Sequence, residues 1–173
     1  MARHSEALQP GYLVSIVQPE FQPETPPEVP PRRHLRVAVH DITEPYEGAV
    51  LPDDKHVREL VDYLIAWPGD EALLIHCFAG ISRSTAAALI ALSLHLDEFE
   101  AARELRAAAP HAHPNPRIIA LADRVLGREG RLVAAREAMG PGSMLCEGPL
   151  TTLPLEIAKS RPGPGPSLPG KGC

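Results

Sequence analysis

Residues 72–85 read Ala-Leu-Leu-Ile-His-Cys-Phe-Ala-Gly-Ile-Ser-Arg-Ser-Thr, and the fold class is predicted from the pattern of this segment and its neighbours. Residues 72–75 form a short continuous apolar run, which is typical of a strand buried on both faces. The mostly apolar stretch from about Ser84 to His95 predicts a helix. The loop from His76 to Ser84 therefore joins a buried strand to a helix, as in α/β proteins.

Strand and helix patterns alternate on the amino-terminal side of this stretch. Residues 12–17 are β-branched and aromatic, and residues 34–40 alternate with period two, so both segments predict strands. Apolar residues spaced by three and four between positions 57 and 65 predict a helix capped by Asp53 or Asp54. Further helices are predicted to end near residue 9, to run from a cap at Asp97 to about residue 109, and to cover residues 116–126 (capped by Asn115) and 131–139.

This order of elements predicts an α/β fold class, with a central, mostly parallel sheet flanked by helices on both faces and a helical C-terminal layer. We expect one folded domain over residues 1–140. Residues 141–173 are rich in proline and glycine, which predicts a disordered tail. The proline-rich residues 19–31 predict an extended connecting loop, with a motif for a proline-binding partner as the alternative.

Composition and charge disfavour several classes of function. The net charge is −5 and no long basic run is present, which argues against a nucleic-acid partner. No apolar stretch is long enough to span a bilayer and no secretory signal is evident, so we expect no membrane partner and a cytoplasmic location. The widely spaced Cys77, Cys146 and Cys173 do not predict a disulfide framework. His111 and His113 lack a third ligand, which favours an exposed loop over a metal site.

The loop of residues 76–84 has the features of an anion-binding site. Backbone N–H groups of a tight loop can point inward around an oxyanion. The N-terminus of the following helix adds free N–H donors and the positive end of its dipole. Glycine permits the sharp bend that such a loop needs, and arginine offers a planar pair of donors to two phosphate oxygens. The residues expected to bind the substrate phosphate are therefore Phe78, Ala79, Gly80, Ile81, Ser82 and Arg83.

Cys77 is the predicted nucleophile of this loop. The field of a helix N-terminus and of Arg83 favours the thiolate, which is the nucleophilic form of cysteine. A thiolate beside a bound phosphate can attack phosphorus, and the same donors stabilise the transition state. We expect Ser84 to donate its hydroxyl to the sulfur, with a plain helix cap as the alternative. His76 is expected to support the loop by hydrogen bonding.

The loop resembles the signature of the protein tyrosine phosphatase superfamily, in which histidine and cysteine are followed by five residues, arginine, and serine or threonine. Gly80 and the run Ser82, Arg83 and Ser84 are similar to its dual-specificity branch, in the form of a small bacterial-type domain. The resemblance implies a central sheet with flanking helices, a phospho-cysteine intermediate on Cys77, and no metal or organic cofactor. It also implies hydrolysis of phosphotyrosine, and of phosphoserine or phosphothreonine, in proteins.

Asp41 is the predicted general acid. In the family that the loop resembles, an aspartate on a separate upstream loop protonates the leaving oxygen. Asp41 follows a predicted strand and precedes Cys77 by 36 residues. Because the carboxyl ends of parallel strands meet at one edge, both side chains are expected on the same rim of the sheet. The alternatives in the same acidic segment are Glu44, Glu47, Asp53 and Asp54.

The same loop is compatible with other functions. A phosphatase for a non-protein ester is one alternative, although the absence of lysine from the loop disfavours polyanionic inositol phosphates. A binding module without turnover is disfavoured by the intact Cys77, Arg83 and Ser84. A sulfurtransferase would also use a cysteine in an anion-binding loop, but Asp41 and His76 fit it less well. The predicted partner is a phosphorylated protein or a small phosphate ester.

Overall fold

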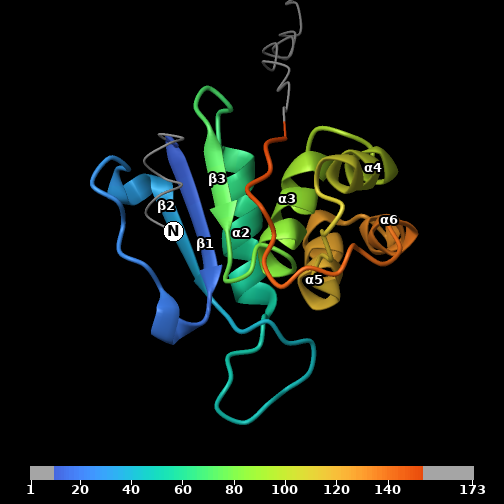
Figure 1. The fold of residues 1–173 in the computed structure, drawn as a ribbon, viewed down its shortest axis with the longest axis horizontal. Coiled ribbons are helices and arrows are strands. Elements are labelled where there is room, and N and C mark those ends of the chain that lie inside the picture. The colour runs from blue at the N-terminus through green and yellow to red at the C-terminus, as the bar shows by residue number, and fades with distance from the viewer. Residues whose placement is uncertain (1–9, 154–173) are drawn as a thin grey trace, which may run out of the picture.

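Three parallel strands form the central sheet of the protein (Figure 1). The structure is a computed structural model, and it describes residues 10–153. Strands β1 (Tyr12–Val17), β2 (His34–Ala38) and β3 (Leu73–His76) lie in the order β2-β1-β3. Val14 of β1 pairs with Leu35 on one side and with Ile75 on the other. Because the strands are parallel, the residues that follow β2 and β3 emerge at the same edge of the sheet.

Helices begin where the sequence supplies caps. Asp53 accepts a hydrogen bond from His56 N, Asp97 accepts one from Phe99 N, and Asn115 caps the helix that starts at Pro116. Gly127 ends that helix with φ +64°. The helices in the described residues are the 3₁₀ helices η1 (Pro19–Phe21) and η2 (Pro31–Arg33) and the α-helices α2 (Asp54–Ala66), α3 (Arg83–Ser93), α4 (Glu98–Ala108), α5 (Pro116–Leu126) and α6 (Arg131–Ala138).

An aliphatic core joins the sheet to the helices. Val14 and Ile16 of β1 are fully buried in it. Helix α2 contributes one apolar face, Val57, Leu60, Val61 and Leu64. Burial of a side chain such as Leu60 or Ile16 contributes about 1.5–3 kcal/mol each, so this core holds the strand ends in place. No helix in residues 10–153 is long and apolar enough to cross a membrane.

The predicted parallel sheet with flanking helices and a helical C-terminal layer is confirmed. Two element boundaries differ from the prediction. Strand β2 ends at Ala38, because His40 N leaves the sheet and donates to Val50 O at 2.9 Å. Helix α3 begins at Arg83 and ends at Ser93, two residues before the predicted end. The helix predicted to end near residue 9 lies outside the described residues.

The second face of the sheet differs from the expectation of helices on both faces. Helices α2 and α3 pack on the face that carries Val14 and Ile16. On the other face, within residues 10–153, the connection between β1 and β2 packs along the strands instead. Its Val29 is 1% exposed, and its Thr25 Oγ1 lies 2.9 Å from His34 Nδ1. The proline-rich residues 19–31 thus form the predicted connecting loop and also cover part of the sheet.

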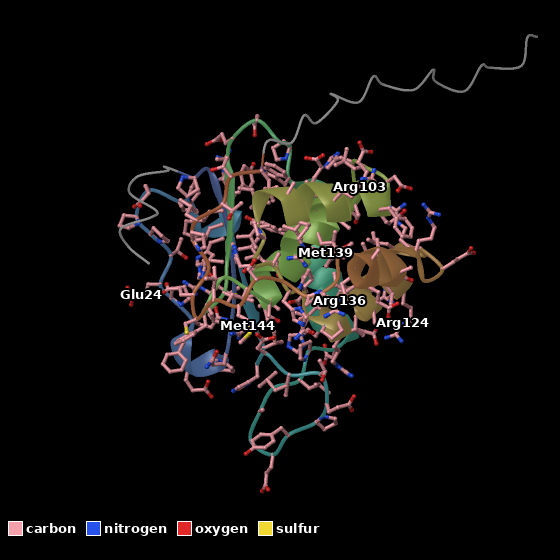
Figure 2. All side chains as sticks on the ribbon, turned by 45° about the vertical axis from the view of Figure 1, so that its right-hand side comes forward. Glu24, Arg103, Arg124, Arg136, Met139 and Met144 are labelled. Atoms are coloured by element: carbon pink, nitrogen blue, oxygen red, sulfur yellow. The ribbon has the colours of Figure 1, made fainter. Side chains whose placement is uncertain are left out.

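The described part of the segment after α6 packs against the folded part of the chain. Residues 141–153 contain no helix or strand. Ser143 N nevertheless donates to Pro110 O at 2.8 Å, and Gly148 N donates to Ala79 O at 2.7 Å. Figure 1 shows this segment running back past the loop that follows β3. Figure 2 shows Met144 on it, almost fully exposed, while Leu153 packs against the core.

Candidate active site

The loop between β3 and α3 lies at the carboxyl edge of the sheet and holds Cys77 at its base. Cys77 is 4% exposed, and its Sγ lies 3.1 Å from Ser84 Oγ in the first turn of α3. Gly80 has φ +71°, a conformation that residues with a Cβ rarely adopt, so the predicted bend does require glycine. The sulfur therefore lies at the N-terminal end of α3, where the helix dipole is positive.

The N-terminus of α3 is arranged for an anion. Ser82 occupies the N-cap position, but its side chain makes no capping hydrogen bond and donates to Asp41 instead. The first-turn N–H groups of α3 therefore remain available to a bound oxyanion. Thr85 Oγ1 donates to Ile81 O and to Ser82 O, which fixes the backbone of the loop.

Arg83 is buried, and its guanidinium is held on one side. Its Nη1 donates to Val39 O at 2.8 Å and to Gln18 Oε1 at 3.2 Å. Its Nε is buried and has no hydrogen-bond partner within residues 10–153. An unpaired buried donor costs about 1–3 kcal/mol, and more on a charged group, so a bound oxyanion that paired this nitrogen would relieve that cost. The edge formed by Nε and Nη2 matches two oxygens of a phosphate.

Asp41 contacts the same loop. Its Oδ1 accepts hydrogen bonds from Ser82 Oγ at 2.7 Å and from Asn115 Nδ2 at 2.8 Å. Its Oδ2 lies 3.9 Å from Arg83 Nε, and the side chain is 38% exposed. The carboxyl group is thus close to the unpaired edge of the guanidinium and accessible to a leaving group or a water molecule.

The other acidic candidates are engaged elsewhere or point away. Asp53 caps α2, and the hydrogen bond from His56 N lowers the pKa of its carboxyl group, which disfavours the protonated form. Asp54 pairs with Arg124 Nη2 at 2.9 Å. Glu44 and Glu47 are exposed on the loop between β2 and α2, which projects from the body of the protein in Figure 1. Asp41 is the acidic residue of this segment that hydrogen-bonds to the cysteine loop.

His76 lies behind the loop in a chain of polar groups. Its Nδ1 is 3.3 Å from Cys77 O, and its Nε2 is 2.6 Å from Ser15 Oγ. Ser15 is fully buried and also lies 2.8 Å from His34 Nε2. Burial lowers the pKa of His76 and lowers that of His34 to about 4, so both imidazoles are neutral near pH 7. The neutral His76 thus lies within hydrogen-bond distance of the backbone at Cys77.

The remaining predicted phosphate-binding residues line the loop, and one of them faces solvent. Phe78 is 66% exposed and its ring lies 6.0 Å from that of Phe21, which is 59% exposed on η1. Ala79 O accepts the hydrogen bond from Gly148 N, and Ile81 O accepts one from His113 N at 2.9 Å. The backbone of the loop is therefore tied on its outer side to two later segments of the chain.

Sequence reasoning missed several contributors to the site. Gln18 holds Arg83, and Asn115, predicted only as a helix cap, also binds Asp41. His111 was expected in an exposed loop, but it is 4% exposed. The reason is that Gly148 lies against it, so closely that a Cβ at Gly148 would lie 2.5 Å from His111 Nε2. No single-sequence signal connects these residues, because each contact joins segments far apart in the chain.

No group of three or more residues suited to hold a metal ion is present in residues 10–153. The side chains of the site, a thiol, a guanidinium, a carboxyl group and two hydroxyls, suit an oxyanion rather than a cation.

Comparison with known proteins identifies similar folds. The chain matches no protein-family model and no curated protein. Among solved structures it is similar to DUSP15, with a TM-score of 0.55, 21% identity, and coverage of 80% of this chain and 82% of that one. It is also similar to human DUSP28, with a TM-score of 0.54, 21% identity and coverage of 73% and 81%. A third similar structure is a mouse protein described as a dual specificity phosphatase, complexed with zinc tungstate. Its TM-score is 0.53 and its sequence identity is 22%, and the match covers 73% of this chain and 77% of that one.

Proposed function

We propose that this protein, which has the fold of the dual-specificity phosphatases, is a cysteine-dependent phosphatase that acts through Cys77. The observation that carries the proposal is the buried Nε of Arg83. It lacks a partner within residues 10–153 and lies 3.9 Å from Asp41 Oδ2, in the loop that also holds Cys77. A phosphate at this position would pair the unsatisfied donor and present phosphorus to a thiolate.

In the first step, the Cys77 thiolate attacks phosphorus. The sulfur–phosphorus bond forms as the bond from phosphorus to the leaving oxygen breaks. The N–H groups at the start of α3 and the free edge of Arg83 stabilise the charge on the three equatorial oxygens. The leaving oxygen takes the proton of Asp41, so an alcohol or phenol departs rather than its anion.

In the second step, water hydrolyses the phospho-cysteine. Asp41, now a carboxylate, accepts a proton from the attacking water molecule. The sulfur–phosphorus bond breaks, its electron pair returns to Cys77, and inorganic phosphate is released. The hydroxyl of Ser84, 3.1 Å from the sulfur, donates a hydrogen bond to the thiolate as it departs.

Two aromatic rings at the loop favour an aryl phosphate as substrate. Phe78 directly follows the nucleophile, and both it and Phe21 expose more than half of their surface. Exposed aromatic rings beside a reacting group offer packing surface to another ring. We therefore propose phosphotyrosine in a protein as the main substrate class, with phosphoserine, phosphothreonine and small phosphate esters as secondary substrates.

The test is release of phenol from an aryl phosphate ester by the full chain. Cys77→Ser should abolish turnover, because a serine hydroxyl is far less ionised than a thiol at neutral pH. Cys146→Ser is the matched control, since Cys146 is exposed and outside the proposed machinery, and it should retain activity. Equal rates for the wild type and Cys77→Ser would show that the proposed function is wrong.

A further inference from the structure

Asn115 joins three parts of the site. Its backbone N donates to Ser82 O at 3.3 Å, which ties it to the cysteine loop. Its side-chain Oδ1 accepts from Arg117 N at 3.0 Å and from Ile118 N at 3.1 Å, which caps α5. Its side-chain Nδ2 donates to Asp41 Oδ1 at 2.8 Å. Asn115 is 2% exposed, so water does not compete for these bonds.

The two oxygens of Asp41 have different surroundings. Oδ1 accepts two hydrogen bonds, from Asn115 and from Ser82. Both of these donors point a hydrogen at Oδ1, so a proton placed on Oδ1 would meet two other hydrogens. A protonated carboxyl group has one O–H oxygen, which donates, and one carbonyl oxygen, which accepts. Because Oδ1 already accepts two hydrogen bonds, it is the carbonyl oxygen of the protonated Asp41. The proton therefore belongs on Oδ2, the oxygen that lies 3.9 Å from Arg83 Nε.

The backbone that carries Asp41 is fixed to the same helix. Arg117, two residues after Asn115, donates Nε to Pro52 O at 2.7 Å and Nη1 to Thr43 O at 3.3 Å. His40 N donates to Val50 O, which closes the loop at its base. The start of α5 therefore restrains both the backbone and the side chain of the acid.

We propose that Asn115 is the positioning residue for the general acid, and that it acts with Ser82 to keep the transferable proton on Asp41 Oδ2, facing the phosphate. This inference rests on the proposed function, in which Asp41 protonates the leaving oxygen. Its consequence is specific. Loss of Asn115 Nδ2 should lower kcat/KM more for a substrate whose leaving oxygen is more basic, because that oxygen depends more on the proton from Asp41.

The variant Asn115→Asp separates the two roles of the side chain. Aspartate caps a helix about as well as asparagine, so the bonds from Arg117 N and Ile118 N are retained. It has no N–H donor for Asp41, and it brings a carboxylate against Oδ1. The measured quantity is the ratio of kcat/KM for an aryl phosphate with an acidic phenol to kcat/KM for phenyl phosphate, with thermal unfolding as the check of the fold.

Asn115→Asp should raise this ratio by about tenfold, and Asp41→Asn should raise it further, within the range of about 10²–10⁴ that a general acid supplies. In the Asp41→Asn background, Asn115→Asp should raise it no further, because the two residues act through one proton. Ser82→Ala removes the second donor to Asp41 Oδ1 and should also raise the ratio. If Asn115→Asp does not fold, Ser82→Ala tests the positioning of the proton in its place. Asp97→Ala removes the cap of α4, away from Asp41, and should lower stability without changing the ratio.

The possible results are distinguishable. If Asp41→Asn raises the ratio while folded Asn115→Asp and Ser82→Ala do not, the positioning inference is wrong and the proposed general acid stands. If Asp41→Asn leaves the ratio unchanged, both the acid and its positioning are refuted. If Asn115→Asp raises the ratio equally in both backgrounds, its effect does not pass through Asp41, and the inference is also wrong.

Discussion

Replacing Ser84 by alanine removes the hydroxyl that lies 3.1 Å from Cys77 Sγ. The two residues are 6% and 4% exposed, so water does not take the place of the hydroxyl. A hydrogen bond to a charged group contributes about 1.5–3 kcal/mol. Since about 1.4 kcal/mol corresponds to a tenfold change in rate, departure of the thiolate from phosphate should slow by about 10- to 100-fold.

The phospho-cysteine should accumulate in Ser84→Ala. Its hydrolysis regenerates the negative charge on sulfur that the hydroxyl stabilises, whereas its formation consumes that charge. Rapid mixing of Ser84→Ala with an aryl phosphate that has an acidic phenol should give a burst of phenol close to the enzyme concentration, followed by slow turnover. Ser84→Thr keeps the hydroxyl and is the control. Turnover at the wild-type rate with no burst in Ser84→Ala would refute a role of this hydroxyl in thiolate departure.

Arg83→Lys should lower kcat/KM by at least about 100-fold, because lysine offers no second parallel donor to phosphate. Inhibition by inorganic phosphate should weaken as well. Near-normal kinetics would show that the edge formed by Arg83 Nε and Nη2 does not bind the phosphate. Burial and Arg36 lower the pKa of His34 to about 4, below its value of about 6.5 in the unfolded chain. The contribution of the neutral His34 to the free energy of unfolding should therefore be fully present above pH 6.5 and be lost as the pH falls toward 4. The urea midpoint should be lower at pH 5 than at pH 7, and this difference should be smaller in His34→Gln. Phe78→Ala should raise KM more for phenyl phosphate than for an alkyl phosphate, and equal effects would count against aryl recognition.

The sequence predicts the fold well because its signals are local. The apolar run before Cys77 and the period-two pattern from His34 each describe a strand that the structure contains. Asp53, one of the two residues predicted to cap the helix, is its N-cap, and Gly80 lies in the predicted bend. In each case the cause, a pattern of burial, a cap or a backbone conformation, acts within a few residues of the signal.

The sequence does not predict the contacts that complete the site. Gln18 and Arg83 are 65 positions apart, and Asp41 and Asn115 are 74 positions apart. These pairs meet only because the carboxyl ends of β1 and β2 and the starts of α3 and α5 converge at one edge of the sheet. The position of Asn115 before Pro116 predicts a helix cap, and its Oδ1 does cap α5. Its bond to Asp41 is made by Nδ2 and has no counterpart in the local sequence pattern.

The hydrogen bond between Gly148 and Ala79 bears on how the protein can be shortened. A chain that stops at residue 140 keeps every strand and helix of residues 10–153, yet it loses a clasp on the outer side of the phosphate loop and uncovers His111. Although residues 141–153 carry no regular structure, they are hydrogen-bonded to the folded part of the chain, so we expect a fragment cut at residue 140 to unfold at a lower temperature than one cut after Leu153.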